Sequence, residues 1–510
     1  MSLSGSTAQG PFRASWPLGL VLVGCVARFV WYQLQIGAFG GDNAYWFDFA
    51  RQIGTGHLAL THLAGWKGVD QSAFIHPPLY PFLLSLVDGA LDGRYWYLSG
   101  NLLSFAFAVL ELIVFSRLLG RLGITGWTAG AALAGLALDP FFDSFSTFPS
   151  YGALLMLLSL TALWLASEAL EGSLVKAILA GMVSGLTTLT LYVGAAVGLG
   201  IGLGLIVRRR GRLAVGFALG ALVVVAPLAL YIWGDAARHG IFQAQMAALA
   251  NDRSYGSSLL NIPRTVWGDG KFSFVGWLGI LAAPVALATA VRKREDSGTV
   301  FMAAASVCCG FLLLPGSFVA IHRLVAFHPY YPLLLAALPH RGTPRRIAYG
   351  LLCLGAAGAS LRFTRELFEG RASGQQIQYN AASVARMEAT LRARIPRTAR
   401  ILAPDPFRLV FPEWRNVYDS LLINVCDWSF YPRERSIAQV VREDLKFTPD
   451  MIVLPDPRFE PGFSPQNCPA LSAYLGQGFR QADPLILEGH RLDVWERQSR
   501  RDRRISCNRK

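Results

Sequence analysis

The chain has 510 residues, of which 53% are hydrophobic and only 16% are charged, and its formal net charge is +14. Soluble domains carry about 25% charged residues, so this composition excludes a wholly soluble protein. Basic chains often bind nucleic acid. Here, however, much of the positive charge lies in short loops between apolar segments, where the preference of Lys and Arg for the cytoplasmic side explains it. We therefore expect membrane lipids as partners, and no nucleic acid.

Apolar segments of about 17 to 25 residues, each long enough to cross a bilayer core, recur through the first 361 residues. The first has no small-residue cleavage site and is expected to remain as an uncleaved span. About eleven transmembrane helices are predicted, at 16–35, 95–117, 125–141, 149–169, 174–190, 190–207, 213–233, 273–291, 299–318, 322–338 and 345–361. The segment 77–91 is apolar but short and opens with two prolines, so we expect it to lie in the membrane interface.

The orientation follows from the basic loops. If the segment 77–91 does not cross the membrane, all of them fall on the cytoplasmic side and the C-terminal domain falls outside. These loops are 117–121, 171–176, 208–212, 292–294 and 340–346. Among the few ionisable residues within predicted spans, Arg28 and Glu111 are candidates for a functional role or for a buried structural pair.

Residues 362–510 are polar and predict a small extracytoplasmic α/β domain appended to the membrane domain at 1–361. Extended apolar runs alternate there with helical patterns, at 400–403 and 450–454 and at 381–395 and 436–445, respectively. No cysteine spacing suits a metal site. Cys426 and Cys468 are candidates for a disulfide if the domain is extracytoplasmic, although the sequence does not fix the pairing.

The first outer loop, 37–76, holds the densest group of polar and aromatic residues in the membrane half. Asp42 follows the first span closely, so its carboxyl is expected near the membrane surface. Partial desolvation there would make it more basic, as a general base acting on a hydroxyl requires. The alternative interpretation is that Asp42 caps a helix that starts at Asn43.

An ordered set of motifs resembles the GT-C glycosyltransferases, and most closely the branch with protein O-mannosyltransferases and lipid A aminoarabinose transferases. The motifs are Gly41-Asp42 with Tyr45, Gly54 with Gly56, His76-Pro77-Pro78-Leu79-Tyr80, Leu138-Asp139-Pro140, Gly181 to Thr190, and Arg323 beside the stretch Phe327 to Leu335. The resemblance implies a GT-C-like helical membrane fold with juxtamembrane helices in the first outer loop. It covers about 300 residues and adds little for the C-terminal domain.

The resemblance also implies a chemistry. It makes Asp42 the base that activates an acceptor hydroxyl at the outer face, with a sugar on a polyprenyl phosphate as donor and inversion at the anomeric carbon. The charge of the departing lipid phosphate would be stabilised by cations, for which His76, Lys67 and Arg323 are the candidates. His76 stands where the aminoarabinose transferases have a lysine, and a histidine need not be charged at pH 7.

Judged by residue type and by position in the sequence, the candidate substrate contacts are Asn43, Tyr45, Asp48, Tyr80, Asp143 and Arg264. Many relatives have a second acidic residue directly after the catalytic aspartate. The asparagine at position 43 weakens the case for a carboxylate-pair metal site. We predict no cofactor, although oligosaccharyltransferases of the same superfamily use a divalent metal.

A transporter or flippase for a lipid-linked sugar is the main rival hypothesis, and a degenerate scaffold is a third. A transporter is expected to show inverted repeats, which the sequence lacks. The glycine-rich run 198–204 resembles a nucleotide-binding loop but lies inside a predicted span, so it indicates close helix packing. The excess of Arg over Lys favours a bacterial inner-membrane protein with a periplasmic C-terminal domain. Neither the sugar nor the acceptor follows from the sequence.

Overall fold

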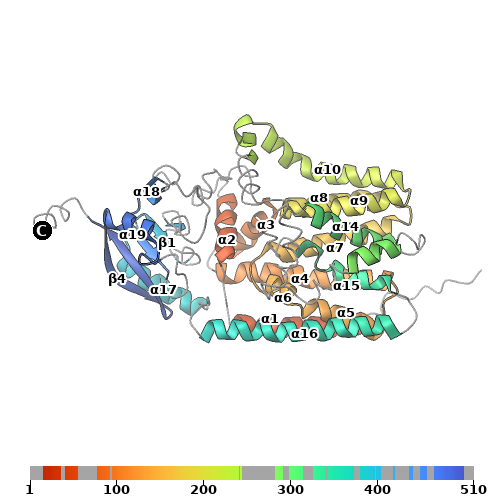
Figure 1. Ribbon diagram of the computed structural model, residues 1–510, viewed down its shortest axis with the longest axis horizontal. Helices are drawn as coiled ribbons and strands as arrows, with labels where there is room; N and C mark the ends of the chain where they lie inside the picture. The colour runs from red at the N-terminus through yellow and green to blue at the C-terminus, as the bar shows by residue number, and fades with distance from the viewer. Residues whose placement is uncertain are drawn as a thin grey trace, which may run out of the picture.

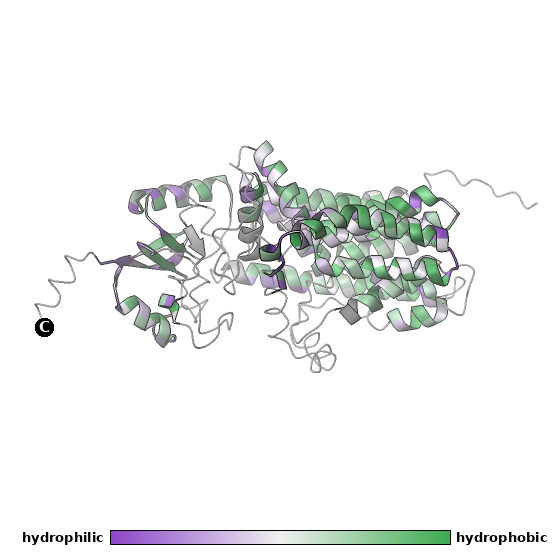
Figure 2. Cartoon of the chain, turned by 90° about the horizontal axis from the view of Figure 1, so that it is seen from above, coloured by the Kyte–Doolittle hydropathy of each residue, from purple (hydrophilic) through white to green (hydrophobic). Residues whose placement is uncertain are grey.

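The structure is a computed structural model that consists of a helical bundle and a smaller α/β domain at one end of it (Figure 1). It describes residues 15–35, 41–54, 77–91, 95–240, 242–243, 282–290, 298–313, 325–338, 343–372, 379–396, 398–403, 410, 417–419, 436–439, 441, 448–455 and 464–498. Coloured by hydropathy, the bundle is mostly apolar, whereas the C-terminal domain is mixed (Figure 2).

Long helices make up the bundle. Its elements are α1 (Ser15–Gln35), α2 (Gly41–Gly54), α3 (Leu79–Ala90), α4 (Trp96–Arg121), α5 (Gly126–Ala137), α6 (Pro140–Thr147), α7 (Tyr151–Ala169), α8 (Leu174–Thr190), η3 (Tyr192–Gly194), α9 (Ala195–Val207), α10 (Gly211–Trp233), α14 (Gly298–Leu313), α15 (Tyr330–Leu334), η5 (Leu335–Ala337) and α16 (Thr343–Ala372). Within the described residues, five of these are long and apolar enough to cross a membrane, namely α1, α4, α7, α10 and α16. The chain is therefore an integral membrane protein, and the count of eleven spans stays a prediction.

Two predicted spans are interrupted in the structure. The segment predicted at 125–141 ends its first helix at Ala137, and α6 begins at Pro140, because proline has no N–H to continue a helix and Asp139 accepts the Phe141 N–H at 2.9 Å. The segment predicted at 322–338 has, in its described part, only the five-residue α15 flanked by 3₁₀ turns. Pro329 and Pro332 remove donors there.

Helix α2 lies across the end of the bundle, roughly perpendicular to α1, α4 and α16 (Figure 1). Its partner α3 has 12 residues, about 18 Å of helix, against a hydrocarbon core of about 30 Å. The interfacial helix predicted at 77–91 is therefore too short to span. Helix α16 is longer than expected and continues through residue 361, the predicted domain boundary, to Ala372.

Glycines bring neighbouring helices of the bundle into backbone contact. A Cβ on Gly181 of α8 would stand 1.9 Å from the Phe217 carbonyl oxygen of α10, and a Cβ on Gly220 would stand 2.1 Å from that of Ile178. In the glycine-rich run, Gly200 faces the backbone of Ser306 in α14 in the same way, and Gly204 faces the side chain of Met302 in that helix. The interpretation of that run as helix packing is confirmed, since small residues allow helices to approach closely.

The end of the bundle away from α2 is rich in charge. Arg121, at the end of α4, pairs with Glu171 at 2.8 Å, and Lys176 of α8 pairs with Glu168 at 2.7 Å. Arg208, Arg209 and Arg210 follow α9 at the turn into α10. Several of the predicted cytoplasmic basic residues thus gather at one end, as a positive-inside distribution requires.

The C-terminal domain contains a five-stranded mixed sheet in the order β2-β1-β3-β5-β4. Its strands are β1 (Ile401–Ala403), β2 (Val417–Asp419), β3 (Met451–Leu454), β4 (Phe479–Leu487) and β5 (His490–Arg497), and its helices are α17 (Ala381–Arg394), α18 (Ile437–Gln439) and α19 (Pro469–Gly476). The two predicted strands are β1 and β3, which pair in parallel. Sequence patterns missed β2, α19 and the antiparallel hairpin of β4 and β5.

Alternating side chains of β3 serve two cores, because successive residues of a strand point to opposite faces. Ile452 and Leu454 pack with α18 and α19, whereas Met451 and Val453 belong to the cluster that contains the buried face of α17. Helices therefore cover both faces of the sheet.

Cys468 is disulfide-bonded and fully buried at the start of α19. Cys426 lies outside the described residues, so the Cys426–Cys468 pairing stays a prediction. We expect Cys468→Ser to destabilise the C-terminal domain by about 2–4 kcal/mol, because a disulfide restricts the unfolded chain. Thermal unfolding of the purified full-length protein checks this, with the free cysteine variant Cys353→Ser as control. Equal unfolding midpoints for the two variants would show that the disulfide does not stabilise the domain.

Candidate functional site

The candidate site is the end of the bundle where α2 carries Asp42, and aromatic contacts hold this helix against two neighbouring helices. The Trp46 ring meets Tyr80 of α3 edge-on, with centroids 5.9 Å apart, and Tyr151 of α7 at 5.1 Å. Trp46 is buried, as are its two partners. Edge-to-face aromatic pairs contribute beyond their buried area, so α2 is anchored to two other helices at this point.

A second contact joins α2 to the C-terminal domain through α4. The ring centroids of Phe47 in α2 and Trp96 are 6.1 Å apart, and Trp96 also contacts Tyr379, 5.6 Å away, just before α17. Gly100 makes room for this arrangement, since a Cβ there would stand 3.0 Å from Phe47 and 2.6 Å from Pro149. The helix that bears Asp42 is therefore linked to the base of the appended domain through Trp96.

An ion pair connects α2 to α3. Arg51 Nε lies 3.7 Å from Asp88 Oδ2, and the Ser99 hydroxyl of α4 is 3.5 Å from the other carboxylate oxygen. Burial raises the pKa of the Asp88 carboxyl, and the Arg51 guanidinium partly offsets that rise. The pair orients the two juxtamembrane helices relative to each other.

Asp42 is the second residue of α2, which begins at Gly41. It therefore lies in the first turn, one residue inside the helix, and not at the capping position that the alternative interpretation gave it. Asn43, Tyr45 and Asp48 follow in the same helix. The structure describes the backbone of these four residues, and their proposed roles as base and substrate contacts stay predictions.

The candidate phosphate-binding residues His76, Lys67 and Arg323 lie outside the described residues, as does Arg264. The structure therefore does not test their predicted roles. The described chain resumes at Pro77 and runs directly into α3. His76 thus precedes a helix that contacts α2 through Trp46 and Tyr80.

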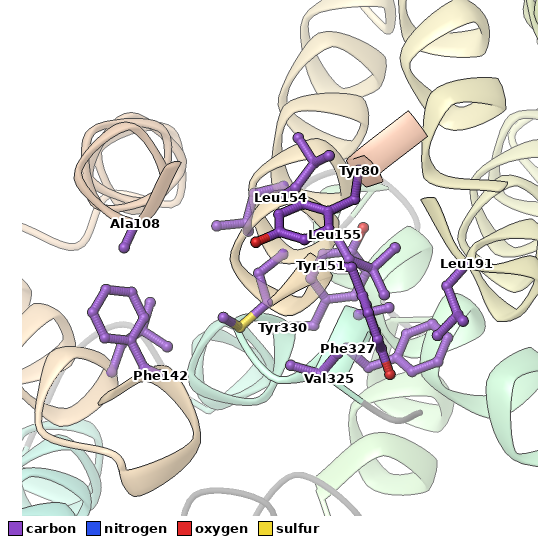
Figure 3. Close-up of a cluster of buried hydrophobic side chains, with 14 of the residues drawn as sticks. Tyr80, Ala108, Phe142, Tyr151, Leu154, Leu155, Leu191, Val325, Phe327 and Tyr330 are labelled. Atoms are coloured by element: carbon purple, nitrogen blue, oxygen red, sulfur yellow. The ribbon is translucent and has the colours of Figure 1, made fainter. Parts of the chain in front are cut away.

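Tyr80, a candidate substrate contact, is fully buried in the structure (Figure 3). Its hydroxyl is 3.4 Å from Ser104 Oγ, and that oxygen accepts the Ser150 N–H at 3.2 Å. The close-up shows Tyr80 among Tyr151, Leu154, Leu155 and Tyr330 (Figure 3). In this conformation Tyr80 packs α3 onto α4 and α7.

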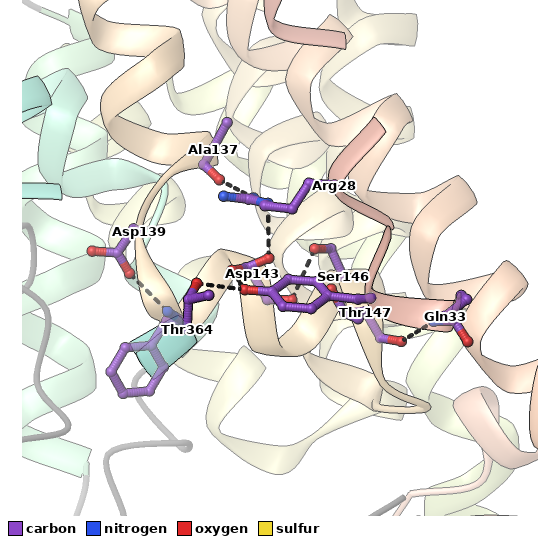
Figure 4. Close-up of polar contacts among 10 residues, drawn as sticks. Arg28, Gln33, Ala137, Asp139, Asp143, Ser146, Thr147 and Thr364 are labelled. Carbon is purple, nitrogen blue, oxygen red and sulfur yellow. Dashed lines mark hydrogen bonds and ion pairs between the residues drawn. The ribbon is translucent and has the colours of Figure 1, made fainter. Parts of the chain in front are cut away.

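Asp143, the other described candidate contact, lies at the centre of a buried polar network (Figure 4). Its carboxylate pairs with Arg28 Nε at 3.1 Å and accepts the Tyr32 hydroxyl at 3.0 Å. Arg28 also donates to the Ala137 carbonyl, and the Tyr32 hydroxyl is 2.9 Å from Thr364 of α16. The network joins α1, α5, α6 and α16. In this conformation the side chain of Asp143 is only 1% exposed and engaged by protein groups.

The partner of Arg28 is therefore Asp143, and not Glu111. Glu111 is completely buried on α4, and in the described part of the chain its carboxyl oxygens have no hydrogen-bond partner. Ionisable side chains are costly in an apolar interior, and Glu111 is such a side chain within a helix long enough to span the membrane.

Sequence reasoning missed a second buried pair. His328 Nε2 lies 2.9 Å from Asp139 Oδ1, and both side chains are buried. A histidine in the otherwise apolar run 324–338 was the available signal, because ionisable residues within membrane segments are rare and usually paired. Among the described residues, no group of three or more His, Cys, Asp or Glu side chains is arranged to hold a metal.

Comparison with known proteins shows which solved structures share the fold of this chain. No family model matches the sequence, and no curated protein does. ArnT from Cupriavidus metallidurans, a lipid A aminoarabinose transferase of the GT-C superfamily, was solved bound to undecaprenyl phosphate. It aligns with 14% identity and a TM-score of 0.55 over 93% of this chain and 98% of its own.

The chain has the GT-C fold. The apo structure of the same ArnT aligns with 16% identity and a TM-score of 0.54, over 94% of this chain and 97% of its own. Arabinosyltransferase EmbB from Mycobacterium smegmatis also matches, with 16% identity and a TM-score of 0.41 over 71% of this chain and 38% of its own. The predicted resemblance to GT-C proteins is confirmed for the fold, and the ArnT alignments include most of the C-terminal domain along with the bundle.

Proposed function

We propose that this GT-C protein is a glycosyltransferase that moves a sugar from a polyprenyl-phosphate carrier to an acceptor hydroxyl at the outer face of the membrane. The observation that carries the proposal is the alignment with ArnT over 93% of this chain and 98% of that one. That structure holds undecaprenyl phosphate. A carrier of this kind suits an enzyme whose site lies at the end of a membrane bundle.

Asp42 is the general base in this proposal. Its carboxylate takes the proton of the acceptor hydroxyl, and the acceptor oxygen attacks the anomeric carbon. The bond between that carbon and the phosphate oxygen breaks on the opposite side, which inverts the anomeric centre and releases the polyprenyl phosphate. The negative charge of the departing phosphate is stabilised by His76, Lys67 and Arg323. Arg suits phosphate because its guanidinium donates two parallel hydrogen bonds.

The proposed orientation puts the C-terminal domain in the periplasm of a bacterial cell. Two observations support it. The disulfide at Cys468 suits an oxidising compartment, and the basic turns after α4 and α9 lie at the opposite end of the bundle, where a positive-inside distribution puts the cytoplasm. The acceptor then meets Asp42 on the periplasmic side.

The test is a mass-spectrometric profile of polyprenyl-phosphate sugars in cells that carry either the native protein or Asp42→Asn. Asparagine keeps the size of the side chain but cannot take a proton, so one carrier-linked sugar is expected to accumulate in the mutant only. The control is Asp235→Asn, which changes an exposed carboxylate just beyond the end of α10. Phe49 of α2 packs against that end of α10. The control profile is expected to match the native one.

Identical pools for native protein and a stably inserted Asp42→Asn variant would refute the proposed base. Accumulation of a carrier-linked sugar confined to the cytoplasmic face would instead favour a flippase.

A further inference from the structure

The turn between α9 and α10 presents a compact group of arginines, which we call the arginine hairpin: Arg209, Arg210 and Arg212. The turn is closed by hydrogen bonds from Arg209 N–H to the Ile206 carbonyl at 2.8 Å and from Arg210 N–H to the Leu205 carbonyl at 3.0 Å. Arg209 has a φ of 56°, in the left-handed region that favours glycine. The chain thus has a cationic side chain at the one position of this turn where glycine would be less strained.

The arginine hairpin is exposed and not neutralised by the protein. All three side chains are exposed, and within the described residues none forms an ion pair with a carboxylate. At the same end of the bundle, by contrast, Arg121 and Lys176 pair with glutamates. As far as the described residues go, the hairpin therefore offers donors without a carboxylate partner to an anion from outside the chain.

The hairpin lies at the far end of the bundle from the C-terminal domain. Trp96, at the start of α4, contacts Tyr379, and the 26 residues of α4 reach about 39 Å to Arg121, which bonds to Glu171. Leu174, three residues after Glu171, packs against Gly216 near the start of α10. The α9–α10 turn therefore belongs to the leaflet that faces away from the C-terminal domain.

Apolar side chains that point outward flank the hairpin directly. Ile206 and Val207 are 62% and 50% exposed at the end of α9, and Val215 and Leu219 are 60% and 55% exposed on the first turns of α10. Such exposed apolar side chains suit contact with lipid tails. The arginines begin where these side chains end, which places them at the depth of the lipid headgroups.

We propose that the arginine hairpin binds the phosphate of an anionic phospholipid in the leaflet away from the C-terminal domain. The charge is complementary, the guanidinium groups suit bidentate contact with phosphate oxygens, and the flanking apolar surface receives the acyl chains. Arginines that only set the orientation of the protein in the membrane would need their positive charge. They would not need a left-handed backbone conformation at Arg209, where a glycine would be less strained.

The test uses the purified full-length protein and native mass spectrometry, with phosphatidylglycerol as the probe and phosphatidylcholine as the neutral comparison. Each arginine near the surface is expected to contribute about fivefold in affinity. The triple variant Arg209→Gly, Arg210→Gln, Arg212→Gln should therefore bind phosphatidylglycerol about 100-fold more weakly, with phosphatidylcholine binding unchanged. The control variant Arg362→Gln, Arg365→Gln removes exposed arginines from α16 that have glutamate partners, and should bind like the native protein.

The single variant Arg209→Gly separates binding from folding. Glycine relieves the left-handed conformation, so the unfolding temperature should not fall, while the affinity for phosphatidylglycerol should fall about fivefold. Unchanged lipid affinity in the triple variant would overturn the proposal, as would a loss that appears only together with a lower unfolding temperature. Displacement of the lipid by inorganic phosphate at equal concentration would also overturn it, because the site would then recognise a free anion.

Discussion

Replacing Asp143 by alanine is expected to destabilise the bundle by about 3–5 kcal/mol, because the change leaves the largely buried Arg28 guanidinium without its counter-charge. Arg28 and Asp143 are 3.1 Å apart, and the Asp143 carboxyl is 1% exposed. The variant also removes the acceptor of the Tyr32 hydroxyl. Thermal unfolding of the purified protein, followed by tryptophan fluorescence, measures the loss.

The double variant Arg28→Met, Asp143→Leu is the matched control for that experiment. It removes both charges together, and replacing a buried ion pair by apolar residues of similar volume is often nearly neutral. We expect it to recover most of the stability that Asp143→Ala loses. Equal losses in the single and double variants would show that the pair itself, and not the stranded arginine, determines the stability.

Replacing Gly181 by alanine is expected to cost about 3 kcal/mol or more. A Cβ at this position would lie 1.9 Å from the Phe217 carbonyl oxygen and 3.0 Å from the Ala221 nitrogen, both backbone atoms of α10. Because backbone atoms cannot move aside as a flexible side chain can, α8 and α10 must separate, at the upper end of the cost of overpacking. The unfolding midpoint of the purified protein checks this.

Gly19→Ala provides the comparison for the glycine prediction. Gly19 lies within α1 and has nothing within 4 Å of the place where a Cβ would stand. Alanine there should stabilise the helix by about 0.5–1 kcal/mol, because glycine is a poor helix former. A fall in the midpoint of similar size for both variants would contradict the close backbone contact of α8 and α10.

Hydropathy predicted the spans that are continuous helices, because length and apolar composition are local properties of the sequence. The helices α1, α4, α7 and α10 coincide with predicted spans to within a few residues. Hydropathy did not predict the irregular backbone of residues 325–338, where Pro329 and Pro332 interrupt an apolar run whose mean hydropathy still resembles a span. The packing of neighbouring helices supports this irregular segment, for example through the Tyr330 hydroxyl on the Ser159 carbonyl at 2.8 Å.

The candidate site was predictable in part. The sequence placed Asp42 close after the first span, and the structure puts it in the first turn of a helix across the end of the bundle. The contacts of the Tyr80 and Asp143 side chains could not be predicted from the sequence. They are made with residues of other helices, and the sequence pattern does not say which helices pack together. Tyr80 meets Ser104, and Asp143 meets Arg28, 115 positions earlier in the chain.

The continuity of α16 constrains any exchange of the C-terminal domain between relatives. The helix has 30 residues, about 45 Å, and runs unbroken past the apolar part of its sequence. One residue inserted near its end would rotate the direction in which the chain leaves the helix by about 100°. Seven residues would nearly restore the direction but push the domain about 10 Å outward, beyond the reach of the 5.6 Å contact between Trp96 and Tyr379. The length of this helix therefore bears on both the direction and the distance at which the chain leaves the bundle toward the C-terminal domain.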